Sequence, residues 1–410
     1  MRDDSIEAPS RRRALVLSWV AYATYYLGRK AFSATKVAVV RDLRFDASVL
    51  GLMDTVNLAA YAFGQFVSGT VGDRIGSRRL VGLGMLLSAL SCAAFGASSA
   101  VFALGAFYFV TGLAQSTGWP GTTRVVAEWT EPKRRATVMG RWATCYQVGG
   151  FVATPLAGFL AAHYGWRVAM FVPAVVMALV GSVVLVRLPS PVVAPAFDAS
   201  HEPVERAQLA VLKNVALWLY GTSYFFIKLV RYALMLWLPY YLAMSERYDV
   251  EHSAYVASAF DAGGVLGVIL IGRIADRTRR FSKPGLSALW IALLVPVFFA
   301  YSLTSGSVLT DVLVLALLGA LLFGPDSLLS GADAQDLGGS SAPATAVGLV
   351  NGLGSVGAVV QGLFVPMLIK DHDGWGALFR ALALFSLGAV LPLLAVLVWR
   401  RRAVSAGAPS

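Results

Sequence analysis

The 410 residues are 57% hydrophobic and only 14% charged, against about 25% charged in soluble domains. With a mean hydropathy of +0.67, this composition excludes a soluble globular protein and predicts one that crosses the membrane many times. The net charge of +11 comes from basic clusters between or beyond apolar runs. It therefore reports orientation in the membrane and not nucleic-acid binding.

Apolar runs divide the chain into twelve candidate spans, six on either side of a polar break. They are 14–40, 46–71, 79–98, 100–122, 137–162, 165–187, 212–244, 251–275, 285–304, 308–330, 343–369 and 375–399. Since about 20 apolar residues cross a bilayer as a helix, we expect an all-α membrane protein with twelve transmembrane helices. The break begins at Pro189 and carries four prolines, which predicts a linker. The expected domains are an N-terminal six-helix bundle over 1–188, a cytoplasmic linker over 189–210 and a C-terminal six-helix bundle over 211–410.

Basic clusters also predict the orientation of the chain. They fall at 11–13, 74–79, 133–135, 277–280 and 400–402. By the positive-inside rule these segments are cytoplasmic. We expect a multi-pass protein of the cell (inner) membrane with both termini in the cytoplasm.

Four landmarks recur in the same order in both halves of the chain. They are Arg29 and Arg231, Gly69–Arg74 and Gly272–Arg277, Pro120 and Pro325, and Trp166 and Trp375. The offset between paired landmarks drifts only from 202 to 209 residues. The sequence therefore predicts a duplicated six-helix unit, with two similar bundles that enclose a site near the middle of the membrane.

Arg29 lies near the centre of the first predicted span. A charge at that depth is costly and usually faces the interior of a helix bundle or a water-filled path. Three tyrosines precede it by seven, four and three residues and should share its face of a helix: Tyr22, Tyr25 and Tyr26. An arginine beside hydroxyl groups suits an oxyanion. The alternative is a structural arginine that snorkels to a membrane interface or is paired inside the bundle. Arg231 is equally central in its span, so two arginines predict a substrate with two or more negative oxygens.

The loop after the second span carries a known signature. Residues 69–79 match Gly-x-x-x-Asp-Arg-x-Gly-x-Arg-Arg, and the chain resembles the major facilitator superfamily over nearly its whole length. Within it, the chain resembles the organophosphate:phosphate antiporters, which include glycerol-3-phosphate and hexose-phosphate transporters and the sugar-phosphate exchangers. The motifs that carry this narrower resemblance are Tyr25–Lys30, Gln115–Pro120, Leu229–Tyr232, Trp237–Pro239, Asp261–Gly264 and Gly324–Pro325.

The resemblance implies a secondary active transporter that exchanges a phosphorylated small metabolite for inorganic phosphate by alternating access. It implies that Arg29 and Arg231 bind the phosphoryl group, and that Lys30 pairs charges between the halves. Three phenols would line the pocket: Tyr22, Tyr26 and Tyr61.

The chain departs from the glycerol-3-phosphate transporter pattern at three positions. A pocket lysine is replaced by Gln65, a pocket histidine by Tyr146, and an acid after the second arginine by Leu236. Lys228, one turn before Arg231, is closer to the sugar-phosphate exchangers. We expect Lys228 to join Arg231 on the anion, whereas Gln65 and Tyr146 face the uncharged part of the substrate.

Acidic residues in or near the spans have two open roles. The four acids are Asp54, Asp261, Asp326 and Asp333. They either neutralise lysines and arginines or carry protons in a symporter. Acids beside arginines at the cytoplasmic helix ends predict gating contacts: Asp73 with Arg74, and Asp276 with Arg277.

The remaining polar residues indicate no further chemistry. The four histidines have no metal-ligand spacing, and no nucleophile–base arrangement is visible, so we expect no metal, no cofactor and no enzyme activity. The expected partners are a phosphorylated metabolite, inorganic phosphate and the lipid bilayer, with no nucleic acid, and the expected state is a monomer. Two alternatives stay open: a proton-coupled organic-anion symporter, and a non-transporting sugar-phosphate receptor of the same fold.

Overall fold

The computed structural model describes residues 4–131, 135–189, 213–277, 282–303, 307–332, 343–370 and 374–405. The predicted linker lies outside these residues from position 190 onward. The chain divides into two compact units, and each is described by itself below. Unit 1 comprises Met1–Ala196 and Leu236–Ser258, and unit 2 comprises Phe197–Met235 and Ala259–Ser410. The predicted domain boundaries stay a prediction.

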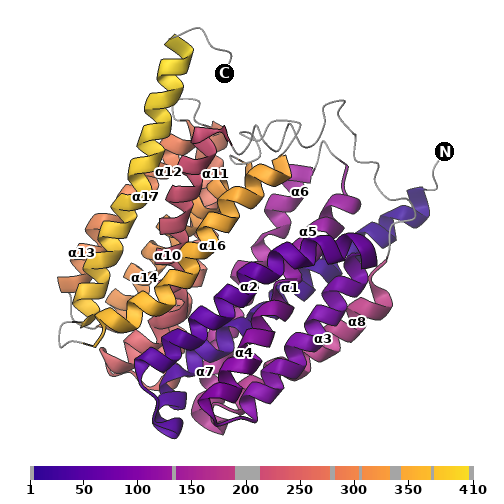
Figure 1. The fold of residues 1–410 in the computed structure, drawn as a ribbon, viewed down its shortest axis with the longest axis vertical. Helices are drawn as coiled ribbons and strands as arrows, with labels where there is room; N and C mark the ends of the chain where they lie inside the picture. The colour runs from indigo at the N-terminus through magenta and orange to yellow at the C-terminus, as the bar shows by residue number, and fades with distance from the viewer. Residues whose placement is uncertain are drawn as a thin grey trace. The chain divides into compact units, whose positions relative to one another are not determined.

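Unit 1 contains the first eight helical segments. They are α1 (Asp4–Leu43), α2 (Ala47–Ile75), α3 (Ser77–Gly96), α4 (Val101–Gln115), α5 (Gly118–Glu128), α6 (Arg135–Trp142), α7 (Thr144–Tyr164) and α8 (Val168–Arg187). Within the unit, α3 packs along α8, α1 along α7, and α2 along α4 (Figure 1). The end of α10 (Val215–Met244) from Leu236 and the beginning of α11 (Val250–Arg277) up to Ser258 also group with this unit.

Unit 2 contains the first part of α10, the rest of α11 and the later helices. These are α12 (Lys283–Ala292), α13 (Leu294–Leu303), α14 (Val308–Ser327), the π-helical turn η2 (Leu328–Ala332), α16 (Pro343–Leu368) and α17 (Gly374–Ser405). Within this unit α17 packs against α12 and α13, and α12 packs against α14 (Figure 1).

The helices agree with the predicted spans. Each of the twelve spans coincides with one helix or with two consecutive helical segments. Ten helical stretches of the described chain are long and apolar enough to cross a membrane. The other two spans lie in α1 and α2, which are less apolar because they carry Arg29, Lys30, Lys36 and Asp54. The prediction of an all-helical, multi-pass membrane protein is confirmed.

Large apolar side chains on the outer faces of the helices show where lipid is needed. Leu90 on α3 and Leu179 on α8 are 68% and 63% exposed, and Leu313 on α14 and Leu391 on α17 are 60% and 66% exposed. In water this much exposed leucine would be costly. The acyl chains of a bilayer remove that cost.

In both units the regular α-helix is interrupted near the repeated proline. α4 ends at Gln115, α5 begins at Gly118, and Pro120 stands in the first turn of α5, where its missing N–H costs no helical hydrogen bond. In unit 2, Pro325 lies in the last turn of α14, which continues as the π-helical turn η2. Such turns are frequent at functional sites. The residues around the two prolines include the partners of both central arginines.

Helices α11 and α14 approach closely through small residues. A side chain added at Gly263 would collide with the backbone of Ala316, and one added at Gly267 would collide with that of Ala320. Both pairs repeat every four residues, which is the spacing that lets membrane helices bring their backbones into contact. This contact fixes the position of α14 in unit 2.

Trp166, the unit 1 member of the repeated tryptophan landmark, has a structural role. The indole Nε1 of Trp166 donates to Asp42 Oδ2 at 2.8 Å, and Arg167 Nη1 donates to the same oxygen at 2.6 Å. The second guanidinium nitrogen of Arg167 reaches Ser99 Oγ at 2.8 Å. The hydrogen bonds from Trp166 and then Arg167 lower the pKa of Asp42, so the carboxylate is ionised at neutral pH. The landmark therefore ties the beginning of α8 to the end of α1.

Candidate functional site

Arg29 of α1 is buried in unit 1, with 7% of its surface exposed. Its Nε donates to Gln115 Oε1 at 3.1 Å. The guanidinium carbon lies 4.9 Å from the centre of the Tyr26 ring and 4.7 Å from that of the Tyr61 ring. Such cation–π contacts are favoured where the charge is desolvated. Two phenols and an amide therefore hold the guanidinium plane in a defined orientation.

Further aromatic side chains of unit 1 pack around Tyr26. The ring centre of Tyr22 lies 6.0 Å from that of Tyr26 and 5.3 Å from that of Trp119. Tyr146 lies 6.2 Å from Tyr26 and 6.4 Å from Trp119, and Trp142 lies 5.8 Å from Tyr22. Rings and phenol hydroxyls together suit the carbon skeleton and hydroxyl groups of a small polar ligand.

Gln65 belongs to the same group of residues through Tyr61. Its Nε2 donates to the Tyr61 hydroxyl at 3.0 Å, and the Tyr61 ring lies on the Arg29 guanidinium. Five of the predicted pocket residues are thus brought together with Arg29 in unit 1: Tyr22, Tyr26, Tyr61, Gln65 and Tyr146.

Tyr25 lies elsewhere. It is fully buried, and its hydroxyl is 3.2 Å from the carbonyl oxygen of Val81 and 2.9 Å from Thr117 Oγ1. Successive residues of an α-helix are about 100° apart, so Tyr25 and Tyr26 cannot point in the same direction. Tyr25 packs α1 against α3 and the α4–α5 junction, whereas the sequence predicted all three phenols on the face of Arg29.

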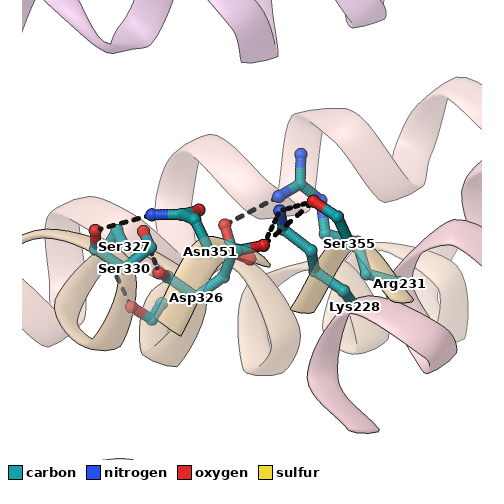
Figure 2. A network of polar contacts seen from close by, with 8 residues as sticks. Lys228, Arg231, Asp326, Ser327, Ser330, Asn351 and Ser355 are labelled. Carbon is teal, nitrogen blue, oxygen red and sulfur yellow. Dashed lines mark hydrogen bonds and ion pairs between the residues drawn. The ribbon is translucent and has the colours of Figure 1, made fainter. Parts of the chain in front are cut away.

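Arg231 of α10 is the corresponding arginine of unit 2 (Figure 2). Its Nη1 donates to Asp326 Oδ2 at 2.7 Å, and the side chains of the two residues are 7% and 4% exposed. The guanidinium carbon lies 4.7 Å from the Phe323 ring centre and 5.6 Å from that of Tyr232. The arrangement resembles that of Arg29. In both cases aromatic rings lie on the guanidinium, and a polar side chain from the fourth span of the same half, Gln115 or Asp326, is hydrogen-bonded to its edge.

Lys228 lies one turn before Arg231 and belongs to the same polar network (Figure 2). Its Nζ is 3.4 Å from Ser355 Oγ and 3.5 Å from the carbonyl oxygen of Asn351, both on α16. The chain contains glycine at 354, where any side chain would collide with Tyr224 and crowd Lys228. Gly354 therefore lets the lysine lie along α16.

The sequence predicts Asp326 as a counter-charge for a lysine or an arginine, and Arg231 is that partner, but it does not identify Gln115 or Trp119 as contacts of the site. Gln115 and Trp119 lie in a motif that was recognised, but no role followed from the motif. A usable signal was their place in the region around Pro120, the counterpart of the region around Pro325, because equivalent regions of a duplicated unit should face their own first helix in a similar way. Trp142 gave no such signal.

The remaining predicted site residues are placed as follows. Lys30 and Asp261 are buried. Asp54 is paired with Lys36 at 2.6 Å, and not with Lys30 or either arginine. Arg74 and Arg277 are exposed at the ends of α2 and α11. The side chains of Asp73 and Asp276 lie outside the part of the chain that the structure describes, so the gating contacts stay a prediction.

Comparison with known proteins agrees with the resemblance seen in the motifs. The chain is 28% identical to a probable hexose phosphate transport protein of Chlamydia muridarum, over 93% of this chain and 90% of the relative. It is also 28% identical to sugar phosphate exchanger 3 of Homo sapiens, over 88% and 87% of the two chains. The same identity, over 92% and 86%, relates it to a putative glycerol-3-phosphate transporter 1 of Arabidopsis thaliana. The predicted resemblance to organophosphate transporters is confirmed.

Solved structures show the same fold at low identity. A bacterial homologue of the human lysosomal transporter Spinster, in an inward-facing and occupied conformation, matches with a TM-score of 0.72 and 16% identity over 97% of this chain and 96% of that one. A nucleoside transporter matches with a TM-score of 0.75 and 13% identity over 94% and 99%. The Major Facilitator Superfamily model matches residues 18–360. The chain belongs to the Major Facilitator Superfamily.

Proposed function

We propose that this protein is a secondary transporter that exchanges a phosphorylated small metabolite for inorganic phosphate by alternating access. The observation that carries the proposal is the pair of buried arginines, Arg29 and Arg231, at equivalent positions of the duplicated chain. Each is oriented by aromatic rings and by one polar side chain. A planar guanidinium held in this way suits the oxygens of a phosphoryl group. The names of the relatives support hexose phosphate, glycerol phosphate or a similar ester as the organic substrate.

In this proposal the two arginines bind the phosphoryl group and Lys228 adds positive charge beside Arg231. The phenols and the amide around Arg29 bind the uncharged part of the substrate: Tyr22, Tyr26, Tyr61, Tyr146 and Gln65. Lys30 and Asp261 pair charges between the two halves as the bundles rock about the substrate.

The proposal includes an orientation and a gate. Both termini lie in the cytoplasm, because the basic segments fall on that side, and the monomer is the working unit. The acid–arginine pairs at the ends of α2 and α11 help to close the cytoplasmic side: Asp73 with Arg74, and Asp276 with Arg277.

Counterflow in proteoliposomes tests the function. Vesicles loaded with inorganic phosphate should take up labelled phosphate, and a panel of phosphate esters should compete with it, whereas phosphate-free vesicles should take up far less. The reason is that a bound anion neutralises the arginines while the carrier changes sides. If an imposed proton gradient drives concentrative uptake into phosphate-free vesicles, the symporter alternative replaces exchange. Binding without any flux would instead favour a receptor.

Gln65→Ala should separate the ester from inorganic phosphate. Removing the amide should weaken a hydroxyl-rich ester by about 1 kcal/mol, the net contribution of one ordinary hydrogen bond, and should leave phosphate affinity nearly unchanged. Competition against labelled phosphate measures both affinities. Tyr61→Phe is the companion variant: it removes the hydroxyl that Gln65 donates to and keeps the ring on Arg29, so it should also weaken the ester and leave phosphate affinity nearly unchanged. Equal losses for phosphate and ester in Gln65→Ala would show that Gln65 only positions Tyr61.

A further inference from the structure

The two central arginines differ in the charge of the side chain that the fourth helix of their own half offers them. In unit 1 the fourth helix of the repeat offers the neutral amide of Gln115 to Arg29. In unit 2 the equivalent helix offers the carboxylate of Asp326 to Arg231. The fourth helix thus offers a neutral oxygen in unit 1, whereas in unit 2 it offers an anionic oxygen of the kind that a substrate would bring.

The geometry of Asp326 resembles that of a bound ligand. Phe323 and Asp326 lie three residues apart on α14, so the helix presents the ring to the face of the Arg231 guanidinium. The Asp326 carboxylate lies at the edge of the same guanidinium (Figure 2). The distance of 2.7 Å from Nη1 to Oδ2 is that of a strong, charge-assisted hydrogen bond. A phosphoryl oxygen bound to the same edge of the guanidinium would occupy the same place.

The second carboxylate oxygen of Asp326 adds little to holding the side chain in place. Oδ1 is buried and has no hydrogen-bond partner among the described residues. A buried carboxylate with a purely structural role normally has both oxygens hydrogen-bonded, since an unsatisfied one is costly. The side chain of Asp326 is therefore held in place chiefly through Arg231.

We propose that Asp326 is an internal competitor of the substrate anion on Arg231. The carboxylate occupies the edge of the guanidinium that a phosphoryl oxygen uses, and binding of the anion displaces it. This inference rests on the proposed function, because it takes Arg231 as a ligand of the anion.

Lys228 receives the displaced carboxylate. It lies three residues before Arg231, so both cationic heads project from the same face of α10, and both residues belong to the polar network of Figure 2. Its hydrogen bonds to Ser355 Oγ and the Asn351 carbonyl, at 3.4 and 3.5 Å, are long. A carboxylate that leaves Arg231 thus stays next to a positive charge.

The test is phosphate affinity after removal of the competing charge. Asp326→Asn keeps the shape and one acceptor oxygen but removes the negative charge, so the dissociation constant for labelled inorganic phosphate should fall. A charge-assisted hydrogen bond shifts an equilibrium constant by about tenfold or more, and we expect a change of that order. Asp326→Glu retains the charge and should not bind phosphate more tightly than the parent protein.

Asp311→Asn is the matched control. Asp311 lies on the same helix, is equally buried, and is hydrogen-bonded to the Tyr301 hydroxyl at 2.8 Å. The same substitution there should leave phosphate affinity unchanged. A gain in affinity in both variants would show a general effect of removing negative charge and would overturn the proposal.

The outcomes separate this inference from the function on which it rests. If the parent protein binds neither phosphate nor any phosphate ester, the proposed function fails and the inference fails with it. If the parent binds phosphate and folded Asp326→Asn binds it equally or less tightly, only the inference fails. Should Asp326→Asn lose its fold, phosphate affinity is measured on Asp326→Ser, which also removes the charge and has a smaller neutral side chain. Loss of the fold in both would identify Asp326 as a structural counter-ion and overturn the proposal.

Discussion

Arg29→Lys and Arg231→Lys should each lower the affinity for inorganic phosphate at least about tenfold, since a charge-assisted hydrogen bond contributes roughly 1.5–3 kcal/mol. Lysine keeps the positive charge but lacks the planar fork that meets two oxygens at once. It also cannot lie flat against Tyr26 and Tyr61, or against Phe323, as the two guanidinium groups do. Binding of labelled phosphate to the purified variants is the measurement.

Arg124→Lys provides the control for this experiment. Arg124 lies on α5 of unit 1 and makes an ion pair with Glu128 at 2.7 Å, with 36% of its side chain exposed. The same change of side chain there should leave phosphate affinity as it is in the parent protein. Unchanged affinity in both Arg29→Lys and Arg231→Lys would remove the two arginines from the site. A loss in only one would assign the anion to that unit alone.

Features that depend on one segment at a time could be predicted from the sequence. The length and polarity of each apolar run fixed the helices, and the depth of Arg29 and Arg231 within their runs marked them as interior charges. The order of repeated landmarks then related the two halves. None of these steps required knowledge of which helix faces which.

Features that depend on contacts between helices could not be predicted in the same way. The Tyr25 hydroxyl bonds to Val81 and Thr117 because α3 and the α4–α5 junction pack on that side of α1. Gln115 and Asp326 reach the arginines because the fourth helix of each half packs near its first. A single sequence indicates the face of each residue within its own helix but not the neighbour on that face.

The pair Lys36–Asp54 could have been found from the sequence. Lys36 lies seven residues before the end of α1, and Asp54 lies seven residues after the beginning of α2. A short turn joins the two helices, so equal distances from the turn place both residues at the same level of the hairpin. The structure confirms this geometry, with Nζ and Oδ2 at 2.6 Å and both side chains fully buried. The Lys36 ammonium also lies 3.8 Å from the ring centre of Trp237.

Breaking this pair should destabilise the protein strongly, whereas removing it whole should not. Lys36→Met or Asp54→Leu alone leaves one buried charge without its partner and should lower the free energy of unfolding by about 3–5 kcal/mol. The double variant buries no charge and should recover most of that loss, because apolar replacements of buried ion pairs are often neutral. Denaturant unfolding of the four proteins, arranged as a double-mutant cycle, measures the coupling. The exposed pair Arg167–Asp42, with side chains 37% and 48% exposed, is the control: Arg167→Met should cost only about 0–1 kcal/mol. If the double variant is as unstable as the worse single variant, the stability of unit 1 depends on the charges themselves and not on their mutual neutralisation.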